Sequence, residues 1–402
     1  MAFGAASCGS NDTGNQRSES LSLDTQGQTI DLMTYWGNPG EAEAVQALID
    51  VHKEAHPEDT IINSSYATGK MDPMYAERLA EGNPPDLVTV HTQTVSRLQN
   101  GGADSLRPMD DFLTSPSRAD IVSQIYPELL TDAAVNDSVY VVPIGENRVN
   151  LFLYNKHVFK AQGLNPPTTV DELLTTCRKL KAAGVTPIRT TFMDLFFKDV
   201  LAGVLGIDAY YSYTRGGAPD EAALTQALDV FEDVVDNCLD PAVPVFGPLD
   251  KPLNAIMSDE AAILVAGEWI KGMVEQLGWT PGVDFGLIDP PGNAGLFVYT
   301  ADGFSIPAGA PNLRGALSFL DTAISVAGQV AFCRFKGVTS VRRDVDLSDA
   351  DSEKRFVIES MKNAKYRVTQ TVIPALGSAI AAFVQTTPRD KEPLLQILLT
   401  TP

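Results

Sequence analysis

The sequence predicts an α/β fold of two lobes joined by several chain crossings, with a ligand cleft between the lobes. Three observations support this prediction. Short apolar strands alternate with amphipathic helices from Thr29 to Val90, a second unit of the same kind begins near Val139, and strand-like segments return near Phe297. The length of 402 residues also suits two domains of ordinary size.

The first unit reads strand, helix, strand, helix, strand. Its expected elements are strands at 29–35, 60–63 and 86–90, a helix with the inner face Val45, Leu48, Ile49 and His52 that ends before Pro57, and a helix at 74–79. Such alternation predicts a parallel sheet with helices on both faces. Ligands of these sheets gather in the loops that follow the strands, which are 36–41 and 91–94 here.

The second unit adds more strands and two clear amphipathic helices. The expected elements are strands at 140–144, 150–154, 260–265, 285–288 and 296–300, and helices at 170–180 and 224–239. Thr169 and Glu172 form a capping box that starts the first of these helices, which ends before Gly184. The chain then passes through Ala301-Asp302-Gly303 into a further strand-like segment, 304–307, and a helix over 313–326.

Because the chain builds one lobe, then another, and then returns, we expect crossing segments that act as hinges. Residues 1–28 are expected to be a polar tether. Lobe one is expected to comprise 29–145 and 303–350, and lobe two 146–302 and 351–402, including C-terminal helices.

Composition excludes several classes of protein. With 44% hydrophobic and 20% charged residues the chain is too apolar to be disordered, and no uninterrupted apolar stretch approaches the roughly 18–20 residues of a membrane-spanning helix. The net charge is −21 and no basic cluster exceeds Arg342-Arg343, which excludes nucleic-acid binding. An uncharged or cationic small ligand fits this charge better.

The N-terminus and the cysteines indicate export. Met1 to Cys8 reads M-A-F-G-A-A-S-C and resembles the lipobox of bacterial lipoproteins, in which Cys8 becomes the acylated first residue; a chance end with a free thiol is the alternative. Cys177 and Cys238 lie on helical stripes and are expected in the core, where a disulfide between them stays open as an alternative. With no C-x-x-C and four scattered His, no metal site or cofactor is expected.

Common catalytic and nucleotide-binding motifs are absent from the sequence, including G-x-x-x-x-G-K-[ST], G-x-S-x-G and H-E-x-x-H. No catalytic residue is therefore assigned. Trp36 and Trp269 follow expected strands and suit the C–H face of a sugar, whereas Trp279 is favoured as a core residue. Packing in the core is the alternative for Trp36 and Trp269 as well.

In order and spacing, a set of short segments resembles the extracellular solute-binding proteins of family 1, the sugar-binding lipoproteins of bacterial ABC importers, and most closely their glucose-binding branch. The resemblance covers about 29–384. It rests on Tyr35-Trp36 with Gly40-Glu41, Gly82-Asn83-Pro84-Pro85-Asp86, Val90-His91, Val142-Pro143-Ile144, Asn147-Arg148, Tyr154-Asn155-Lys156, the run 179–187, Gly267-Glu268-Trp269, Ala301-Asp302-Gly303-Phe304, and Lys336-Gly337 with Val341-Arg342.

The resemblance implies a periplasmic-binding-protein-like fold that closes on a sugar, and it implies a set of site residues. Trp36 would stack on the sugar, Glu41 and His91 would bond its hydroxyls, Trp269 would supply an opposing ring, and Asp302 and Lys336 would reach hydroxyls from the crossing segments. The further positions implied as ligand-binding are Thr89, Arg148 and Ser378. The alternatives are an ion pair for Asp302 and Lys336, an exposed acid for Glu41 and a packed histidine for His91.

This chain departs from the glucose-binding pattern at three positions. Thr89 stands where those proteins usually carry Gln, Leu249 where they carry another Trp, and Gly377-Ser378 where they carry a His. Loss of these large groups predicts a wider pocket or the loss of specific hydroxyl contacts. A different hexose or a disaccharide is therefore favoured over glucose itself.

The sequence thus predicts a monomeric substrate-binding protein that captures a small neutral sugar and delivers it to the permease subunits of an ABC importer. It is expected at the periplasmic or extracellular face of the membrane, held only by a lipid anchor at Cys8 after a secretory signal. The alternatives are the same fold binding a peptide, polyamine or other solute, or a carbohydrate-active enzyme.

Overall fold

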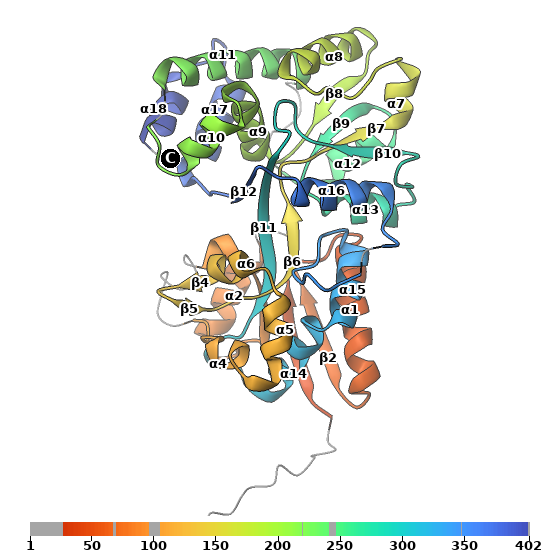
Figure 1. The fold of residues 1–402 in the computed structure, drawn as a ribbon, viewed down its shortest axis with the longest axis vertical. Coiled ribbons are helices and arrows are strands. Elements are labelled where there is room, and N and C mark those ends of the chain that lie inside the picture. The colour runs from red at the N-terminus through yellow and green to blue at the C-terminus, as the bar shows by residue number, and fades with distance from the viewer. Residues whose placement is uncertain are drawn as a thin grey trace, which may run out of the picture.

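The computed structural model describes residues 27–66, 70–95, 105–218, 220–240, 247–346 and 348–400. Two α/β lobes lie end to end, and long strands pass between them through the middle of the molecule (Figure 1). This confirms the predicted fold class. Cys8, the residue predicted to carry the lipid, lies in residues 1–26, outside the described part of the chain.

The sheet of the first lobe has the strand order β12-β11-β3-β1-β2, and β6 also pairs with β11. Its strands are β1 (Thr29–Thr34), β2 (Thr60–Ser65), β3 (Leu87–His91), β6 (Val142–Arg148), β11 (Leu296–Ser305) and β12 (Tyr366–Thr369). Both β2 and β3 run parallel to β1, as the alternating pattern predicts. Ile30, Leu32 and Val90 are almost fully buried because helices cover the sheet.

Helices from both ends of the chain cover this sheet. They are α1 (Glu41–Ala55), α2 (Met71–Ala80), α4 (Asp110–Leu113), α5 (Ala119–Gln124), α6 (Pro127–Asp132), α14 (Leu313–Ala323) and α15 (Val326–Lys336), with short 3₁₀ turns η1 (Thr92–Thr94) and η2 (Pro116–Arg118) and a hairpin of β4 (Ala134–Val135) and β5 (Ser138–Val139). The helix predicted over 313–326 is present as α14 but ends at Ala323. Ser325 caps a new helix, since its side chain accepts a hydrogen bond from the backbone N–H of Gly328 at 3.0 Å.

The second lobe contains a four-stranded sheet in the order β10-β7-β9-β8. Its strands are β7 (Phe152–Asn155), β8 (Thr186–Arg189), β9 (Ala261–Val265) and β10 (Phe285–Ile288). Its helices are α7 (Lys156–Ala161), α8 (Val170–Ala182), α9 (Met193–Leu205), α10 (Ile207–Thr214), α11 (Glu221–Cys238), α12 (Asp250–Met257), α13 (Ile270–Gln276), α16 (Ser352–Lys362), α17 (Pro374–Gln385) and α18 (Glu392–Thr400). The two helices read from apolar stripes, α8 and α11, are both present.

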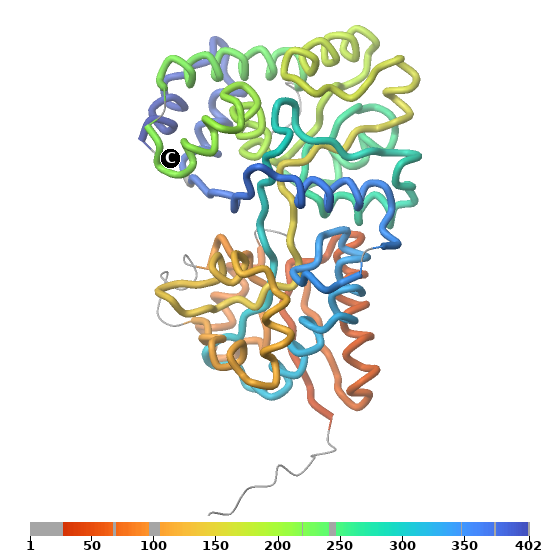
Figure 2. The backbone as a smooth tube through the Cα atoms, viewed as in Figure 1, coloured from red at the N-terminus to blue at the C-terminus, as the bar shows by residue number. Residues whose placement is uncertain are grey.

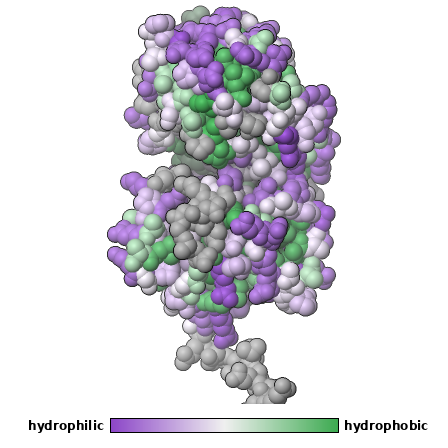
Figure 3. All heavy atoms as spheres, turned by 90° about the vertical axis from the view of Figure 1, so that its left-hand side faces the viewer, coloured by the Kyte–Doolittle hydropathy of each residue, from purple (hydrophilic) through white to green (hydrophobic). Residues whose placement is uncertain are grey.

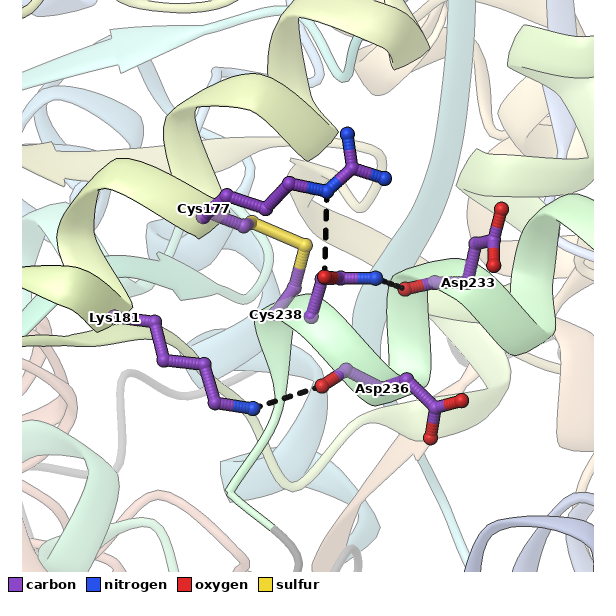
Figure 4. The surroundings of a disulfide bond; sticks show 7 residues. Cys177, Lys181, Asp233, Asp236 and Cys238 are labelled. Carbon is purple, nitrogen blue, oxygen red and sulfur yellow. Dashed lines mark hydrogen bonds between the residues drawn. A yellow bond between two sulfur atoms is a disulfide. The ribbon is translucent and has the colours of Figure 1, made fainter.

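A disulfide joins α8 to α11 through Cys177 and Cys238, whose Cα atoms are 5.0 Å apart (Figure 4). Both cysteines are fully buried, as the helical stripes predict, and the pairing that the sequence left open is present. Next to it, the Lys181 ammonium donates a hydrogen bond to the Asp236 carbonyl at 2.9 Å. Among the described residues, Cys333 is the free cysteine and is buried.

The chain crosses between the lobes three times, along β6, along β11 and through residues 337–346 and 348–351 (yellow, teal and blue in Figure 2). The strand-like segments expected at 296–300 and 304–307 form one strand up to Ser305. β11 runs through Ala301-Asp302-Gly303 as one strand because it pairs with β3, β6 and β12, and only a register shift against β6 marks Asp302 and Gly303. β6 likewise continues to Arg148, beyond the expected end at residue 144.

Buried polar groups hold the three crossings together. Glu146 of β6 and Thr339 of the third crossing exchange backbone hydrogen bonds of 2.8 and 2.9 Å. The Glu146 carboxylate accepts a hydrogen bond from Arg367 at 2.6 Å, and Arg367 also pairs with Glu128. Burial raises the pKa of Glu146 to about 7, although Arg367 opposes that shift.

Among the described residues, no single helix is long and apolar enough to cross a membrane. Helices α14 and α15 together meet that length and composition, but they are bent by 74° to each other.

Candidate functional site

Polar side chains gather where β1 and β3 of the first lobe end. Tyr35 and Trp36 follow β1, and His91 is the last residue of β3. Asp302 lies opposite His91 in the register of β11 against β3, so the sheet brings residues more than 200 positions apart into one cluster. This is the edge of the sheet at which the sequence predicted a ligand site.

Asp302 is the centre of this cluster and is only 2% exposed. Its Oδ1 accepts a hydrogen bond from the Tyr35 hydroxyl at 3.0 Å and lies 2.6 Å from His91 Nδ1. Its Oδ2 accepts a hydrogen bond from Asn147 Nδ2 at 2.9 Å. Burial alone would raise the pKa of Asp302, but Lys336 and His91 outweigh it and hold this pKa well below its usual range. Asp302 is therefore an ionised acceptor.

Lys336, at the end of α15, pairs with two carboxylates. Its Nζ lies 3.2 Å from Asp302 Oδ2 and 3.2 Å from Glu41 Oε1, and it stands 5.1 Å from the centre of the Trp36 ring. Burial opposes its charge, but the charges of Asp302 and Glu41 raise the pKa of Lys336 above its ordinary value. The ion pair between Asp302 and Lys336, given above as an alternative, is present in the structure.

Glu41 begins α1 and is 7% exposed, so the alternative of an exposed helix-start acid is wrong. Its second oxygen accepts a hydrogen bond from Asn38 Nδ2 at 2.8 Å. His91 keeps an exposed fraction of 35% and stacks on the Tyr35 ring with centroids 4.5 Å apart. The cluster therefore reaches the surface of lobe one through His91 while Glu41 and Asp302 lie beneath.

Trp36 is fully buried in this structure, which agrees with the core alternative. Its ring packs against Phe304 at 5.5 Å and Phe332 at 5.0 Å. Its indole N–H is buried without a hydrogen-bond partner among the described residues. The Trp36 ring thus lies next to Lys336, and its indole N–H is a hydrogen-bond donor without an acceptor among the described residues.

Trp269 reaches the first lobe from the second. It precedes α13, is partly buried, and packs against apolar residues of both lobes, with its ring 5.5 Å from that of Phe192. Trp279 instead stacks on Phe285 inside lobe two, which confirms the core interpretation given to it. Seen from the side, the molecule is narrower between the two lobes than across either lobe (Figure 3).

Three of the residues implied by the resemblance have other surroundings. Thr89 is buried, and its hydroxyl oxygen accepts a hydrogen bond from the backbone N–H of Tyr35 at 3.2 Å. Arg148 is buried in the hinge and donates to Asp289 at 2.5 Å. Ser378 is exposed on α17. The structure does not bring these three side chains into the contacts of Asp302.

Tyr35 and Asn147 belong to the cluster but were not singled out from the sequence. Both donate to Asp302, and burial together with Asp302 raises the pKa of Tyr35 well above its ordinary value, so it stays a donor. Their position next to Trp36 and Arg148 was the available signal. Strand pairing decides their role, since Asn147 lies opposite Thr300 on β11.

Chemically, the cluster offers carboxylate acceptors, an ammonium donor and an aromatic platform at one place. The carboxylates of Asp302 and Glu41 share the one ammonium of Lys336, and the hydroxyl in these contacts, that of Tyr35, donates a hydrogen bond to Asp302. In the part of the chain that the structure describes, no group of three or more His, Cys, Asp or Glu is placed to hold a metal ion. This arrangement suits the binding of a neutral, hydroxyl-rich molecule.

Residues 47–356 match the family model described as bacterial extracellular solute-binding protein. Over 369 residues the chain is 28% identical to an uncharacterized ABC transporter extracellular-binding protein of Pyrococcus horikoshii, covering 88% of this chain and 80% of that protein. It is 26% identical over 362 residues to the xylose/arabinose-binding protein XacG of Haloferax volcanii, with coverages of 84% and 74%.

Solved structures share the fold at lower identity. The galactopyranose-preferring bacterial solute receptor AcbH superposes with a TM-score of 0.75 at 14% identity, over 92% of this chain and 97% of that one. The maltotriose-binding protein of Thermus thermophilus gives a TM-score of 0.69 at 18% identity, with coverages of 92% and 98%.

Proposed function

The chain belongs to the bacterial extracellular solute-binding proteins, and from this we propose that it captures a small neutral sugar between its lobes and delivers it to the permease of an ABC importer. The observation that carries the proposal is the buried cluster of Glu41, Asp302 and Lys336 where the strands of the first lobe end, together with Trp269, which packs against apolar residues of both lobes. The relatives support it, since one is a xylose/arabinose-binding protein and others are described as probable sugar-binding periplasmic proteins.

The proposed site consists of Glu41, His91, Trp269, Asp302 and Lys336, and the buried ring of Trp36 supports it by packing next to Lys336. Carboxylates accept from two sugar hydroxyls and an ammonium donates to others, and bonds to charged groups are stronger than neutral ones. The indole ring of Trp269 supplies the flat apolar surface that the C–H face of a sugar needs. Thr89, Arg148 and Ser378 are not included because their observed contacts lie elsewhere.

A neutral ligand is favoured over a cation for an electrostatic reason. Lys336 compensates one of the two negative charges of Asp302 and Glu41, and Tyr35, Asn147 and Asn38 donate hydrogen bonds to their oxygens. The side chains of Asp302, Glu41 and Lys336 are each at least nine-tenths buried. To reach either carboxylate, a cationic peptide or polyamine would have to lose its hydration and displace Lys336 or these neutral donors. Catalysis is not part of the proposal, because the family consists of binding proteins.

The binding step is a shift between conformations. The two proposed moving bodies are residues 29–145 with 303–350 and residues 146–302 with 351–402. A sugar that contacts Asp302 and Trp269 together binds the closed arrangement better than an open one, and the loaded, closed form is what the permease selects. The ligand is a mono- or disaccharide, with glucose one candidate.

We also propose that the protein works outside the cytoplasm, anchored through a lipid on Cys8. The buried disulfide between Cys177 and Cys238 supports export, because such bonds persist in oxidising compartments. Intact mass of the protein extracted from native membranes checks the anchor, and a mass without a lipid on Cys8 would end that part of the proposal.

A sugar screen tests the main proposal. The melting temperature is measured with neutral mono- and disaccharides and, as the competing classes of ligand, with spermidine and short peptides. Only a sugar should raise it. For the sugar found, Trp36→Ala and Asp302→Ala should each weaken binding at least tenfold by calorimetry, or about 1.4 kcal/mol. Trp279→Ala is the matched control and should bind as the wild type does. Stabilisation by spermidine or peptides alone would contradict the proposal.

A further inference from the structure

Three glycines meet where the second lobe touches the first. Gly40 precedes α1, Gly272 lies inside α13, and Gly337 follows α15. In Figure 1, α13 of the second lobe stands above the ends of α1 and α15. We call these three residues the glycine contact.

The glycine contact is made by backbone atoms. A Cβ atom on Gly272 would lie 2.3 Å from the Phe335 carbonyl oxygen and 2.6 Å from that of Lys336. A Cβ atom on Gly337 would lie 2.5 Å from the Gly272 nitrogen, and one on Gly40 would lie 2.7 Å from the Gly272 carbonyl carbon. Backbone cannot turn aside as a flexible side chain does, so a side chain here would push the lobes apart.

Position 272 requires glycine because there is no room for a side chain. Gly40 and Gly337 both have φ of 81°, so their conformation alone favours glycine. Gly272 sits inside a helix and is not among the residues with positive φ. Glycine costs about 1 kcal/mol relative to alanine in a helix interior. The close approach of α15 is what requires the missing side chain.

The glycine contact lies beside both the sugar site and the hinge. Gly40 directly precedes Glu41, Gly337 directly follows Lys336, and Gly272 lies three residues after Trp269. Gly337 also opens the third crossing, in which Thr339 pairs with the backbone of Glu146. During a rotation of the lobes, displacement grows with distance from the axis, so atoms next to the crossings move least.

We infer that the contact among Gly40, Gly272 and Gly337 is the pivot of lobe closure. The lobes stay in backbone contact there while their far ends move, and the contact sets the distance at which Trp269 meets Lys336 and Glu41. This inference rests on the proposed function. It makes Gly272 a positioning residue that touches no ligand.

Gly272→Ala tests the inference. Ordinary van der Waals contact begins at 3.4 Å, so the added methyl group forces α13 and α15 apart by about 1 Å. We expect sugar affinity to fall at least tenfold, while the melting temperature of the free protein falls by no more than a few degrees. Gly309→Ala is the matched control, because its Cβ would lie 3.5 Å from the nearest atom, Pro84 Cγ.

A structural effect alone gives a different pattern. If space around Gly272 were available, alanine would stabilise α13 and leave affinity unchanged. Sugar affinity within twofold of wild type in Gly272→Ala would overturn the inference. If the wild type binds no sugar at all, the proposed function fails instead, so the two failures are distinguishable.

Two measurements test how the lobes move. Small-angle scattering should show that saturating sugar shrinks the radius of gyration of the wild type and shrinks that of Gly272→Ala less. Hydrogen exchange is measured on the wild type, so this test does not depend on whether a variant folds. Amides of residues 270–274 and 335–339 should exchange equally slowly with and without sugar. Protection that appears there only with sugar would show a contact formed on closure, and would overturn the pivot.

Discussion

Replacing Lys336 by methionine removes one positive charge from a buried cluster while keeping a similar length and volume. In the wild type, the ammonium lies 3.2 Å from both Asp302 and Glu41, whose side chains are 2% and 9% exposed. Removing one partner of a buried ion pair costs about 3–5 kcal/mol, because the remaining charge stays buried and uncompensated. Asp302 keeps its bonds to Tyr35, Asn147 and His91, so we expect the low end, about 3 kcal/mol of unfolding free energy at pH 7.

The pH dependence of this loss has a definite sign. In the wild type the pKa of Asp302 is held below its ordinary value, so its contribution to stability is present at neutral pH and is lost as pH falls through and below the ordinary carboxyl range. Without Lys336 that depression weakens, and a proton relieves the buried charge at higher pH. The difference between wild type and variant should therefore shrink as pH falls from 7 towards 4.

Urea unfolding followed by circular dichroism at pH 7 and pH 4.5 measures both effects. Lys365→Met is the control, because Lys365 pairs with Asp208 at 2.6 Å on the exposed surface, where solvent screens the pair and little stability should be lost. If Lys336→Met destabilises the protein no more than Lys365→Met, or if its cost grows in acid, the reasoning about the buried cluster is refuted.

Two further predictions concern the disulfide and the hinge. Replacing Cys177 and Cys238 together by serine opens a link across 61 residues and should lower the unfolding free energy by about 4 kcal/mol in urea, with sugar affinity unchanged; a loss below 1 kcal/mol would contradict this. The pKa of Glu146, raised to about 7, means that its contribution to stability falls as pH rises between its ordinary value of 4.5 and 7. Glu146→Gln should remove roughly 2–4 kcal/mol of this loss of unfolding free energy between pH 4.5 and pH 7. A loss as large as that of the wild type would exclude Glu146 as its source.

The local patterns of this sequence predict its elements better than its connections. The apolar stripes of α8 and α11 and the alternation in β1 arise from burial of one face, which sequence periodicity records directly. The continuity of β11 depends on three partner strands that lie elsewhere in the chain. The sequence shows two strand-like segments on either side of Asp302 and Gly303, and strand pairing joins them into one.

In the candidate site, too, local patterns predict some features and contacts between distant segments decide the others. Residue type and the family resemblance point to Asp302, Lys336 and Glu41, and the structure brings these side chains within hydrogen-bonding distance. The burial of Trp36 depends on packing against Phe304 and Phe332 from distant segments, which periodicity does not record. The disulfide likewise needs the spatial proximity of two helices, since the spacing of two cysteines permits a bond without requiring it.

The threefold crossing of the chain has a consequence for how the protein is made. The first lobe draws β11 and α15 from far along the sequence, and α15 packs against α1 across almost 300 positions. Contacts of such long range close slowly. An emerging chain therefore exposes β3 as an unpaired strand edge until residues 296–305 arrive, and edges of this kind invite aggregation. We expect the first lobe to need protection by chaperones, or to be held unfolded, until about residue 336 has been synthesised.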